Sequence, residues 1–442
     1  MLACGHEKVP FGLPVCVHLR TCRGPDIRYV RWYTGTGLDV ELLCIPCADE
    51  REQGRPAPAD VVCEECFAHA TTEVGELVGV RGKPEVRTRS EPFDGELRKT
   101  ALPNDVGTIV DIAHVGRDGR SSWLMLAEDG RLTRFDADTG AWAHLAVATV
   151  PAEPDHDPWM GHTLKRRLHA SAGGEFAAVV HNYGRYGQII DLRSGKVTLA
   201  LDGGDYHSET VPFSFAFADV HGRVVAVHRT AWNRLDVSDP STGVLLTERE
   251  PTSYRTGEER PEHYLDYFHG ALHVSPSGAR IVDDGWVWHP FGVPMAWGLE
   301  HWLSGNVWES EDGSTMKSLC GRAYYWDHAM TWLDDNRVAV GGIGDDDNVM
   351  IGGARIFDVT LSSDAGERYA RELTAFPGPA GLFFGHGRWL YSSDPTGLSR
   401  WDVSDGTRTG HLPNYQPTHC HQDAGEFVQV IGNVLVRWKV IG

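Results

Sequence analysis

GGEFAAVVHNYGRYGQIIDLRSG, residues 173–195, holds the pattern that decides the fold. A glycine pair precedes one apolar run, and a second apolar run ends in an apolar–Asp pair that a Ser-Gly turn follows. Short runs rich in Val, Ile and Phe, bounded by Gly and Asp, are typical of β-strands joined by tight turns. The stretch therefore predicts a pair of adjacent strands.

The same unit occurs seven times along the chain. Five units end at Asp136, Asp191, Asp236, Asp358 and Asp402, while Trp288-His289 and Lys439 take the place of this Asp in the other two. These positions lie 37 to 69 residues apart, and propeller repeats have about 40–50 residues. Because one small sheet cannot bury both of its faces alone, neighbouring sheets must stack around an axis. We therefore expect an all-β protein, a seven-bladed β-propeller with an N-terminal zinc-binding module.

We expect the zinc-binding module to span residues 1–82 and the propeller to span residues 83–442. The last unit offers only three strands, so an outer strand must come from elsewhere in the chain. Residues 84–93, which precede the first unit, are expected to supply it. Such closure joins distant parts of the chain and removes an exposed strand edge.

The repeating unit resembles the blade of WD40 proteins, and Trp401-Asp402 is the nearest match to the pair that names this family. The resemblance covers roughly residues 85–442, and it departs from the family because the Gly-His pair is mostly missing. The whole chain also resembles uncharacterised bacterial proteins, which implies a bacterial origin but no function.

Paired cysteines predict a metal site in the first part of the chain. Cys44-Ile-Pro-Cys47 and Cys63-Glu-Glu-Cys66 form a C-x2-C, x15, C-x2-C pattern, which indicates zinc. The gap of two residues lets both thiolates of a pair face one ion at about 2.3 Å. A four-cysteine site is coordinatively closed and has a structural role.

Two further pairs lie upstream, Cys4 with His6 and Cys16 with His18. Eight candidate ligands predict two zinc ions, and two pairings are possible. In a sequential arrangement the first two pairs share one ion and the last two share the other. In a cross-braced arrangement the first pair joins the third and the second joins the fourth. The module resembles zinc ribbons, treble-clef fingers and cross-brace fingers in these ligand pairs only.

Charge and composition exclude several classes of partner. The formal net charge is -20, and neither domain has the basic character that phosphate binding requires. We therefore expect no nucleic-acid partner. No stretch is apolar enough for a membrane helix, and the N-terminus lacks the apolar segment of a signal peptide. These absences predict a cytoplasmic location. Seven of the nine cysteines lie within the first 66 residues, and in a reducing compartment such clustering favours metal over disulfides.

Aromatic residues are concentrated between His263 and Gly344. Such density indicates either a binding surface or large side chains that fill the core between blades four and five. The candidates for a binding surface are Trp286, Trp288, His289, Trp308, Tyr325, Trp326, Asp327 and His328. Gly344–Asn348, an acidic run, is expected to form a solvated turn because it lacks the spaced ligands of a calcium loop.

The sequence contains no nucleophile elbow, phosphate-binding loop or metalloprotease helix. We therefore expect a non-catalytic scaffold or recognition protein that binds a protein partner. The alternative is an enzyme or a small-ligand sensor with its site in the propeller channel. Blades four, five and seven would build that site, including the strand with His419 and His421.

Overall fold

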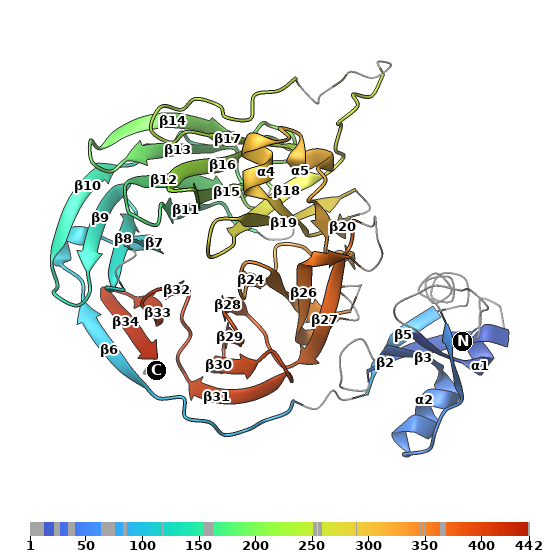
Figure 1. Cartoon of the computed structure of the whole chain (residues 1–442). Helices are drawn as coiled ribbons and strands as arrows, with labels where there is room; N and C mark the ends of the chain where they lie inside the picture. The colour runs from blue at the N-terminus through green and yellow to red at the C-terminus, as the bar shows by residue number, and fades with distance from the viewer. Residues whose placement is uncertain are drawn as a thin grey trace.

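The computed structural model describes residues 13–21, 27–33, 40–62, 76–82, 86–116, 119–153, 162–250, 254, 259–288, 290–344, 347, 350–362 and 368–440. Within these ranges the chain forms one five-stranded sheet near the N-terminus and seven further sheets arranged in a ring (Figure 1). The fold is an all-β propeller of seven blades, which confirms the fold class predicted from the repeats.

Most blades contain four antiparallel strands in sequence order, with the first strand innermost. Blade 1 follows a short 3-10 helix (Asn104–Val106) and contains β7 (Ile109–His114), β8 (Ser122–Ala127), β9 (Arg131–Asp136) and β10 (Trp142–Val147). Blade 2 contains β11 (Lys165–Ala170), β12 (Phe176–Asn182), β13 (Tyr186–Asp191) and β14 (Lys196–Asp202). Blade 5 contains β24 (Met330–Trp332), β25 (Arg337–Ile343), β26 (Ile351–Ser362) and β27 (Ala370–Pro377). Blade 6 contains β28 (Leu382–His386), β29 (Trp389–Asp394), β30 (Gly397–Asp402) and β31 (Thr407–Pro413).

Blades 3 and 4 depart from this plan. Blade 3 contains β15 (Phe215–Val220), β16 (Arg223–Ala231) and β17 (Arg234–Ser238), and a single bridge from Ser238 to Leu245 continues the sheet outward. Blade 4 contains β18 (Phe268–Val274), β19 (Arg280–Val287), β21 (Met295–Gly298) and β22 (Lys317–Ser318), with β20 (Phe291–Gly292) and β23 (Arg322–Ala323) as an extension. Two short helices, α4 (Leu299–Ser304) and α5 (Glu309–Asp312), are inserted before β22.

The recurring Asp and Gly of the sequence form one type of turn. In blade 2, Asp191 Oδ1 accepts hydrogen bonds from the backbone N–H groups of Arg193 and Ser194 at 2.8 and 3.1 Å. Gly195 closes the turn by donating its N–H to the Asp191 carbonyl, and it adopts a φ of 69°, which favours glycine. This turn joins the third and fourth strands, so the repeat marks the same corner of successive blades.

The expected register is wrong in two blades. In blade 3 the turn is made by Asp239, whose carbonyl accepts from Gly243, and not by Asp236. Asp236 is instead buried in ion pairs with Arg234 and Arg249. In blade 4 the pair 288–289 follows the second strand rather than the third, because the preceding apolar run forms the single strand β19.

The ring is closed by a different segment from the one expected. Blade 7 contains β32 (His419–His421), β33 (Glu426–Ile431) and β34 (Val434–Val440), and its outer strand is β6 (Gly95–Ala101), not residues 84–93. The described part of the expected segment, residues 86–93, runs beside blade 6, where Thr88 forms a parallel bridge with Arg408. Phe93 then packs between the two blades against Trp438, which fixes where the chain passes from one blade to the next.

The N-terminal sheet has the strand order β4-β1-β3-β2-β5. Its elements are β1 (Leu13–Cys16), α1 (Val17–Thr21), β2 (Arg28–Tyr33), β3 (Val40–Cys44), α2 (Ile45–Glu52), β4 (Ala59–Val62) and β5 (Glu76–Arg81). The module lies beside blade 5 in Figure 1. Its hydrophobic cluster, which includes Val15 and Leu42, also contains Ile343 and Ala375 of that blade. The module and the propeller therefore share a small apolar contact.

Candidate metal centre and binding face

Two parallel strands bring four candidate metal ligands together. β1 pairs in parallel with β3, so the carboxyl ends of both strands lie at the same edge of the sheet. One strand ends at Cys16 and the other at Cys44, and each continues directly into a short helix. His18 lies near the start of α1 and Cys47 near the start of α2. This repeated strand-to-helix arrangement places all four side chains around one point.

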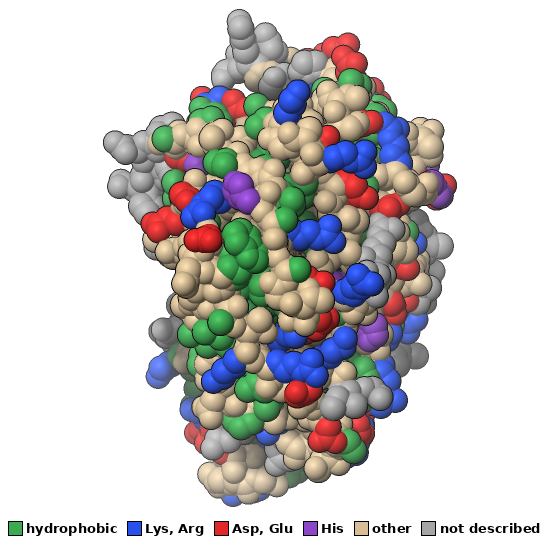
Figure 2. Space-filling view, turned by 90° about the vertical axis from the view of Figure 1, so that its left-hand side faces the viewer, with side chains coloured by type: hydrophobic (Ala, Val, Ile, Leu, Met, Phe, Trp, Pro, Cys, Tyr) green, Lys and Arg blue, Asp and Glu red, His purple; other side chains and the backbone are tan. Residues whose placement is uncertain are grey.

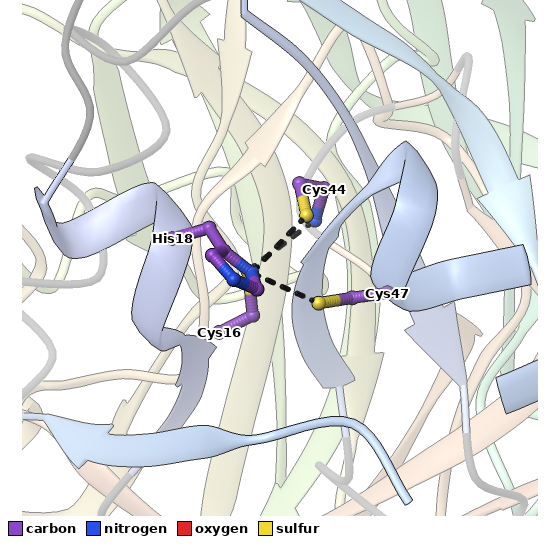
Figure 3. Close-up of side chains that lie close together, drawn as sticks. All are labelled: Cys16, His18, Cys44 and Cys47. Atoms are coloured by element: carbon purple, nitrogen blue, oxygen red, sulfur yellow. Dashed lines mark hydrogen bonds between the residues drawn. The ribbon is translucent and has the colours of Figure 1, made fainter. Parts of the chain in front are cut away.

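The four side chains have the spacing of a metal site (Figure 3). One ligand atom from each of Cys16, His18, Cys44 and Cys47 lies within 4.8 Å of all the others. His18 Nδ1 lies 3.2 Å from Cys47 Sγ and 3.7 Å from Cys44 Sγ. Ligands about 2.0–2.3 Å from a tetrahedral ion lie about 3.3–3.8 Å from one another, so the cluster has the size that zinc requires.

The electrostatics of the cluster also favour a cation. Burial raises the pKa of the Cys44 thiol and of the Cys47 thiol, and the neighbouring Cys16 raises both further. Charged thiolates are therefore unfavourable at this position unless a positive charge compensates them. Three thiolates and one imidazole around a divalent ion would supply that compensation and leave no open position for a substrate.

The observed pairing differs from both expected arrangements. The second pair, Cys16 with His18, joins the third pair, Cys44 with Cys47. The sequence places β2 between these pairs, but the sheet sets β1 directly beside β3, and this adjacency determines the cluster. Cys4, His6, Cys63 and Cys66 lie outside the described residues, so the expected second zinc site is not tested.

Trp286 and Trp326, two of the aromatic candidates, fill the core rather than the surface. Trp286 is fully buried and stacks on Phe268 at 4.4 Å between ring centroids and on Trp326 at 5.1 Å. Trp326 is buried as well, and its indole N–H donates to the Thr210 carbonyl at 3.3 Å. These rings join the loops of blades 3, 4 and 5 at one face of the propeller.

Trp288 is the exposed end of this aromatic stack. Its side chain is 39% exposed and packs edge-on against Trp286. His207 lies next to it at 5.5 Å, and Tyr206, which is 45% exposed, packs against His207. The sequence analysis missed Tyr206 and His207, because they lie in the connection between blades 2 and 3 and meet Trp288 only in the folded ring.

Tyr325 and His328 form a second part of the same face. Their rings stack in parallel with centroids 3.5 Å apart, and the Arg322 guanidinium lies over the Tyr325 ring, 5.0 Å from its centroid. Arg322 is buried and forms an ion pair with Asp284 at 2.7 Å. Burial, with a smaller contribution from the charge of Arg322, lowers the pKa of His328 to about 4, so this imidazole is neutral at physiological pH.

Tyr325 and His328 line an open cavity of about 250 Å³ between blades 5 and 6. Four glycines from β25 and β26 form part of its wall, and Asp347 contributes a carboxylate. The lining residues are Tyr325, His328, Ala329, Gly341, Gly342, Asp347, Met350, Ile351, Gly352, Gly353, Pro379, Ala380, Gly381 and Phe383.

The remaining candidates lie apart from this cavity lining. Trp308 precedes α5 and stacks on His263 at 4.4 Å, with Arg249 over its ring, so it packs against the insertion of blade 4. Asp327 adopts a φ of 55°, and burial raises its pKa to about 7, against the influence of Arg167. His289 lies outside the described residues.

The histidines of the last blade hold neighbouring blades together. His419 on β32 donates to Asp111 of blade 1 at 3.1 Å, and the same carboxylate accepts the backbone N–H of Leu168 in blade 2 at 2.8 Å. Burial alone would raise the pKa of Asp111, but the hydrogen bond from His419 and the charge of Arg167 outweigh it, and the pKa falls below its ordinary value. His421 is buried beside the rings of His114 and Trp123.

No protein-family model and no curated protein matches the chain. Among solved structures, the chain is similar to the β-propeller domain of Cps50 (Swd1) from Myceliophteria thermophila, with a TM-score of 0.47 and 12% identity over 79% of this chain and all of that chain. It is also similar to a chain of a mitotic checkpoint complex, with a TM-score of 0.47 and 13% identity over 82% of this chain and 97% of the other. These similarities concern the backbone alone, and the number of blades rests on the strand pairing described above.

Among the described residues, no helix combines the length and the apolar character needed to cross a lipid bilayer.

Proposed function

We propose that this chain is a non-catalytic protein-binding scaffold of the cytoplasm, with the propeller as its interaction surface and a zinc-dependent module beside it. The observation that carries the proposal is the aromatic stack that ends in the exposed pair Trp288 and Tyr206. Aromatic side chains held rigidly by a buried base lose little conformational entropy on binding, and they dominate the energetics of protein interfaces.

The charge distribution supports a protein partner over nucleic acid. The chain has a formal net charge of -20, and on the side shown in Figure 2 the Lys and Arg side chains are interspersed with Asp and Glu. A phosphate backbone requires a continuous basic surface, which this arrangement does not provide on that side. We therefore expect a protein to bind, and neither nucleic acid nor a membrane.

In the proposed zinc-dependent module, Cys16, His18, Cys44 and Cys47 would hold one zinc ion. When bound, the ion would supply structural cross-linking of β1 and β3 and no reactive centre. The second ion expected from the sequence would need Cys4, His6, Cys63 and Cys66.

Quantitative affinity capture from cells that express the tagged chain at native level tests the scaffold. Replacing both Trp288 and Tyr206 by Ala should remove the proteins that are enriched with the wild type. The matched control is Trp142→Ala, because Trp142 is 42% exposed but lies on β10, at the outer edge of blade 1. Equal capture by the double variant and the control would contradict the proposal.

A small-ligand sensor or an enzyme with a channel site is the second candidate. The favouring observation is Asp327, whose pKa of about 7 suits proton transfer at physiological pH and whose charge partner Arg167 lies on the innermost strand of blade 2. This candidate predicts that a panel of small metabolites includes one that raises the unfolding temperature of the wild type but not of Asp327→Asn. No such ligand is expected if the chain is only a scaffold.

A further inference from the structure

The cavity between blades 5 and 6 is too small for a cofactor and large enough for one side chain. Its volume is about 250 Å³, whereas pockets for drug-sized ligands and cofactors have about 300–1,000 Å³. It opens on the same face as Trp288, because the loop before a first strand and the loop after a second strand lie at the same end of each blade. A protein bound to the aromatic stack could therefore also insert a side chain here.

The charged side chains that line the cavity favour the binding of a cation. Among the described lining residues, Asp347 carries the only carboxylate and none is Lys or Arg. His328 is neutral, since burial lowers its pKa to about 4. Arg322 lies against the Tyr325 ring, but its charge is matched by Asp284 at 2.7 Å. Within the part of the lining that the structure describes, the carboxylate of Asp347 therefore has no cationic partner among the lining side chains.

The shape of the cavity depends on its glycines. A Cβ added at Gly352 would meet no described atom closer than the Pro379 carbonyl oxygen at 3.9 Å, so it would fit there in ordinary van der Waals contact. A Cβ at Gly342 would instead collide with Met350 Sδ at 2.1 Å, and this residue has a φ of 87°. The absence of side chains at these positions leaves the cavity open.

We propose that this cavity receives one lysine or arginine side chain of a partner protein, with Asp347 as its counter-charge. The inference rests on the proposed scaffold function and adds the chemical class of the partner segment: a basic residue next to an apolar one that contacts Trp288. The aliphatic stem of the basic side chain would pack on Met350 and Phe383 while its charged end approaches Asp347.

The cavity also borders the N-terminal zinc-binding module. Ile351 lines the cavity and packs against the hydrophobic cluster that contains Cys16 and Cys47. A segment bound in the cavity would consequently lie close to the contact between the two domains, and zinc would influence binding through the packing of this cluster.

Ligand-observed NMR titration of the zinc-loaded full chain tests the inference. The probes are the N-acetyl methylamides of arginine and lysine, with that of citrulline as the uncharged control of similar shape. The two cations should bind with a dissociation constant on the order of 1 mM, as expected for a fragment of this size, and citrulline at least several-fold more weakly.

Three variants separate the cavity from general effects of charge. Gly352→Leu adds a side chain at a lining position where the Cβ itself would meet no described atom closer than 3.9 Å, and it should abolish binding of both cations. Asp347→Asn should weaken binding about two- to fivefold, as expected for an ion pair with an exposed carboxylate. Asp205→Asn is the control, because Asp205 is 89% exposed near Tyr206 but does not line the cavity, and it should change nothing. Circular dichroism and zinc content confirm the fold of each variant.

Equal affinity for citrulline and arginine, or unchanged binding by Gly352→Leu, would overturn the inference. Affinity capture with the same variant separates this result from the scaffold proposal. If the proteins whose capture requires Trp288 are still captured by Gly352→Leu, the scaffold stands and the cavity has no part in it. If the cations bind as expected and no protein is captured by the wild type, the cation preference stands and the partner protein is refuted.

Discussion

The N-terminal zinc-binding module and the propeller are expected to be stabilised in different ways. The module is a sheet of five short strands whose ligands Cys16 and Cys44 end two neighbouring strands, so one ion would hold the sheet together. The propeller relies on blade-to-blade packing, in which buried rings such as Trp286 and Trp401 fill the spaces between sheets. The comparison indicates that the folding of a domain too small for a large core can depend on one bound ion. The stability of a ring of blades is instead distributed over many packing contacts.

The largest effect on stability should come from replacing one of the candidate zinc ligands. Cys47→Ser should lose at least one of the two zinc ions expected per chain and unfold the module, since structural zinc contributes about 10–16 kcal/mol to the folding of small domains. The propeller should retain its own unfolding transition. Metal content by mass spectrometry and limited proteolysis measure the two outcomes.

The matched control for this change is Cys320→Ser. Cys320 is also buried, but it lies in blade 4 and belongs to no metal cluster among the described residues. It should keep the full zinc content. Loss of zinc in both variants, or in neither, would show that the module does not depend on its ligands in the way described here.

A smaller effect is expected at the closure of the ring. Trp438 on β34 is buried, and its ring lies against Gly95 of β6 and against Phe93. Trp438→Ala should destabilise the propeller by about 3–5 kcal/mol, because it leaves a cavity where the ring closes. Thermal unfolding should show this loss with zinc content unchanged. Trp142→Ala, at an exposed position, should cost less than about 0.5 kcal/mol.

Acid should unfold the propeller through its enclosed histidines. Burial lowers the pKa of His114, His169 and His273 to about 4, whereas the unfolded chain titrates near 6.5. The unfolded state therefore binds more protons between these values, and stability falls as the pH decreases from about 6.5 towards 4, by up to roughly 3 kcal/mol for each group.

His169→Gln and His273→Gln should therefore shift the acid-unfolding midpoint to lower pH, measured by tryptophan fluorescence. His221→Gln is the control, because the His221 side chain is 72% exposed. An unchanged midpoint in the two buried variants would mean that other groups, such as the carboxylate of Asp111, determine acid sensitivity.

The smallest effect concerns a single turn. Gly140 closes the hairpin of blade 1 with a φ of 73°, and an added Cβ would meet no described atom within 4 Å. Gly140→Ala should therefore cost only the backbone strain, about 1–2 kcal/mol. Gly406→Ala makes the same change in blade 6, but its Cβ would lie 2.4 Å from Phe376 Cβ, so the loss in unfolding temperature should be larger.

The sequence predicted the propeller because its repeat is local. The Asp–Gly spacing describes one turn within one blade, and Asp191 with Gly195 can be interpreted without any distant residue. Blade 3 shows the limit of this reasoning, since the apolar–Asp pair Leu235-Asp236 forms a buried ion pair, while the turn is made by Asp239, which follows a serine. An apolar–Asp pair alone does not distinguish a turn from a buried ion pair.

The candidate sites were harder to predict because they depend on which strands are neighbours. The sequence predicted Cys and His as metal ligands, and four of the predicted side chains lie together in the structure, but their pairing follows from the contact between β1 and β3. Likewise, aromatic density pointed to Trp288, whereas Tyr206 lies far from it in the sequence, in the connection between blades 2 and 3. Trp286 and Trp326 belong to the same aromatic run, and only their burial shows that they belong to the core.

The pairing of β6 with β34 has a consequence during translation. β6 is synthesised before its partner strand β34, which follows more than 300 residues later in the chain. At about 5–20 residues per second, this separation corresponds to tens of seconds. Throughout that interval the nascent ring is open and β6 presents an unsatisfied strand edge. A chaperone that shields this edge would determine how much of the newly made chain reaches the closed ring rather than pairing with another copy.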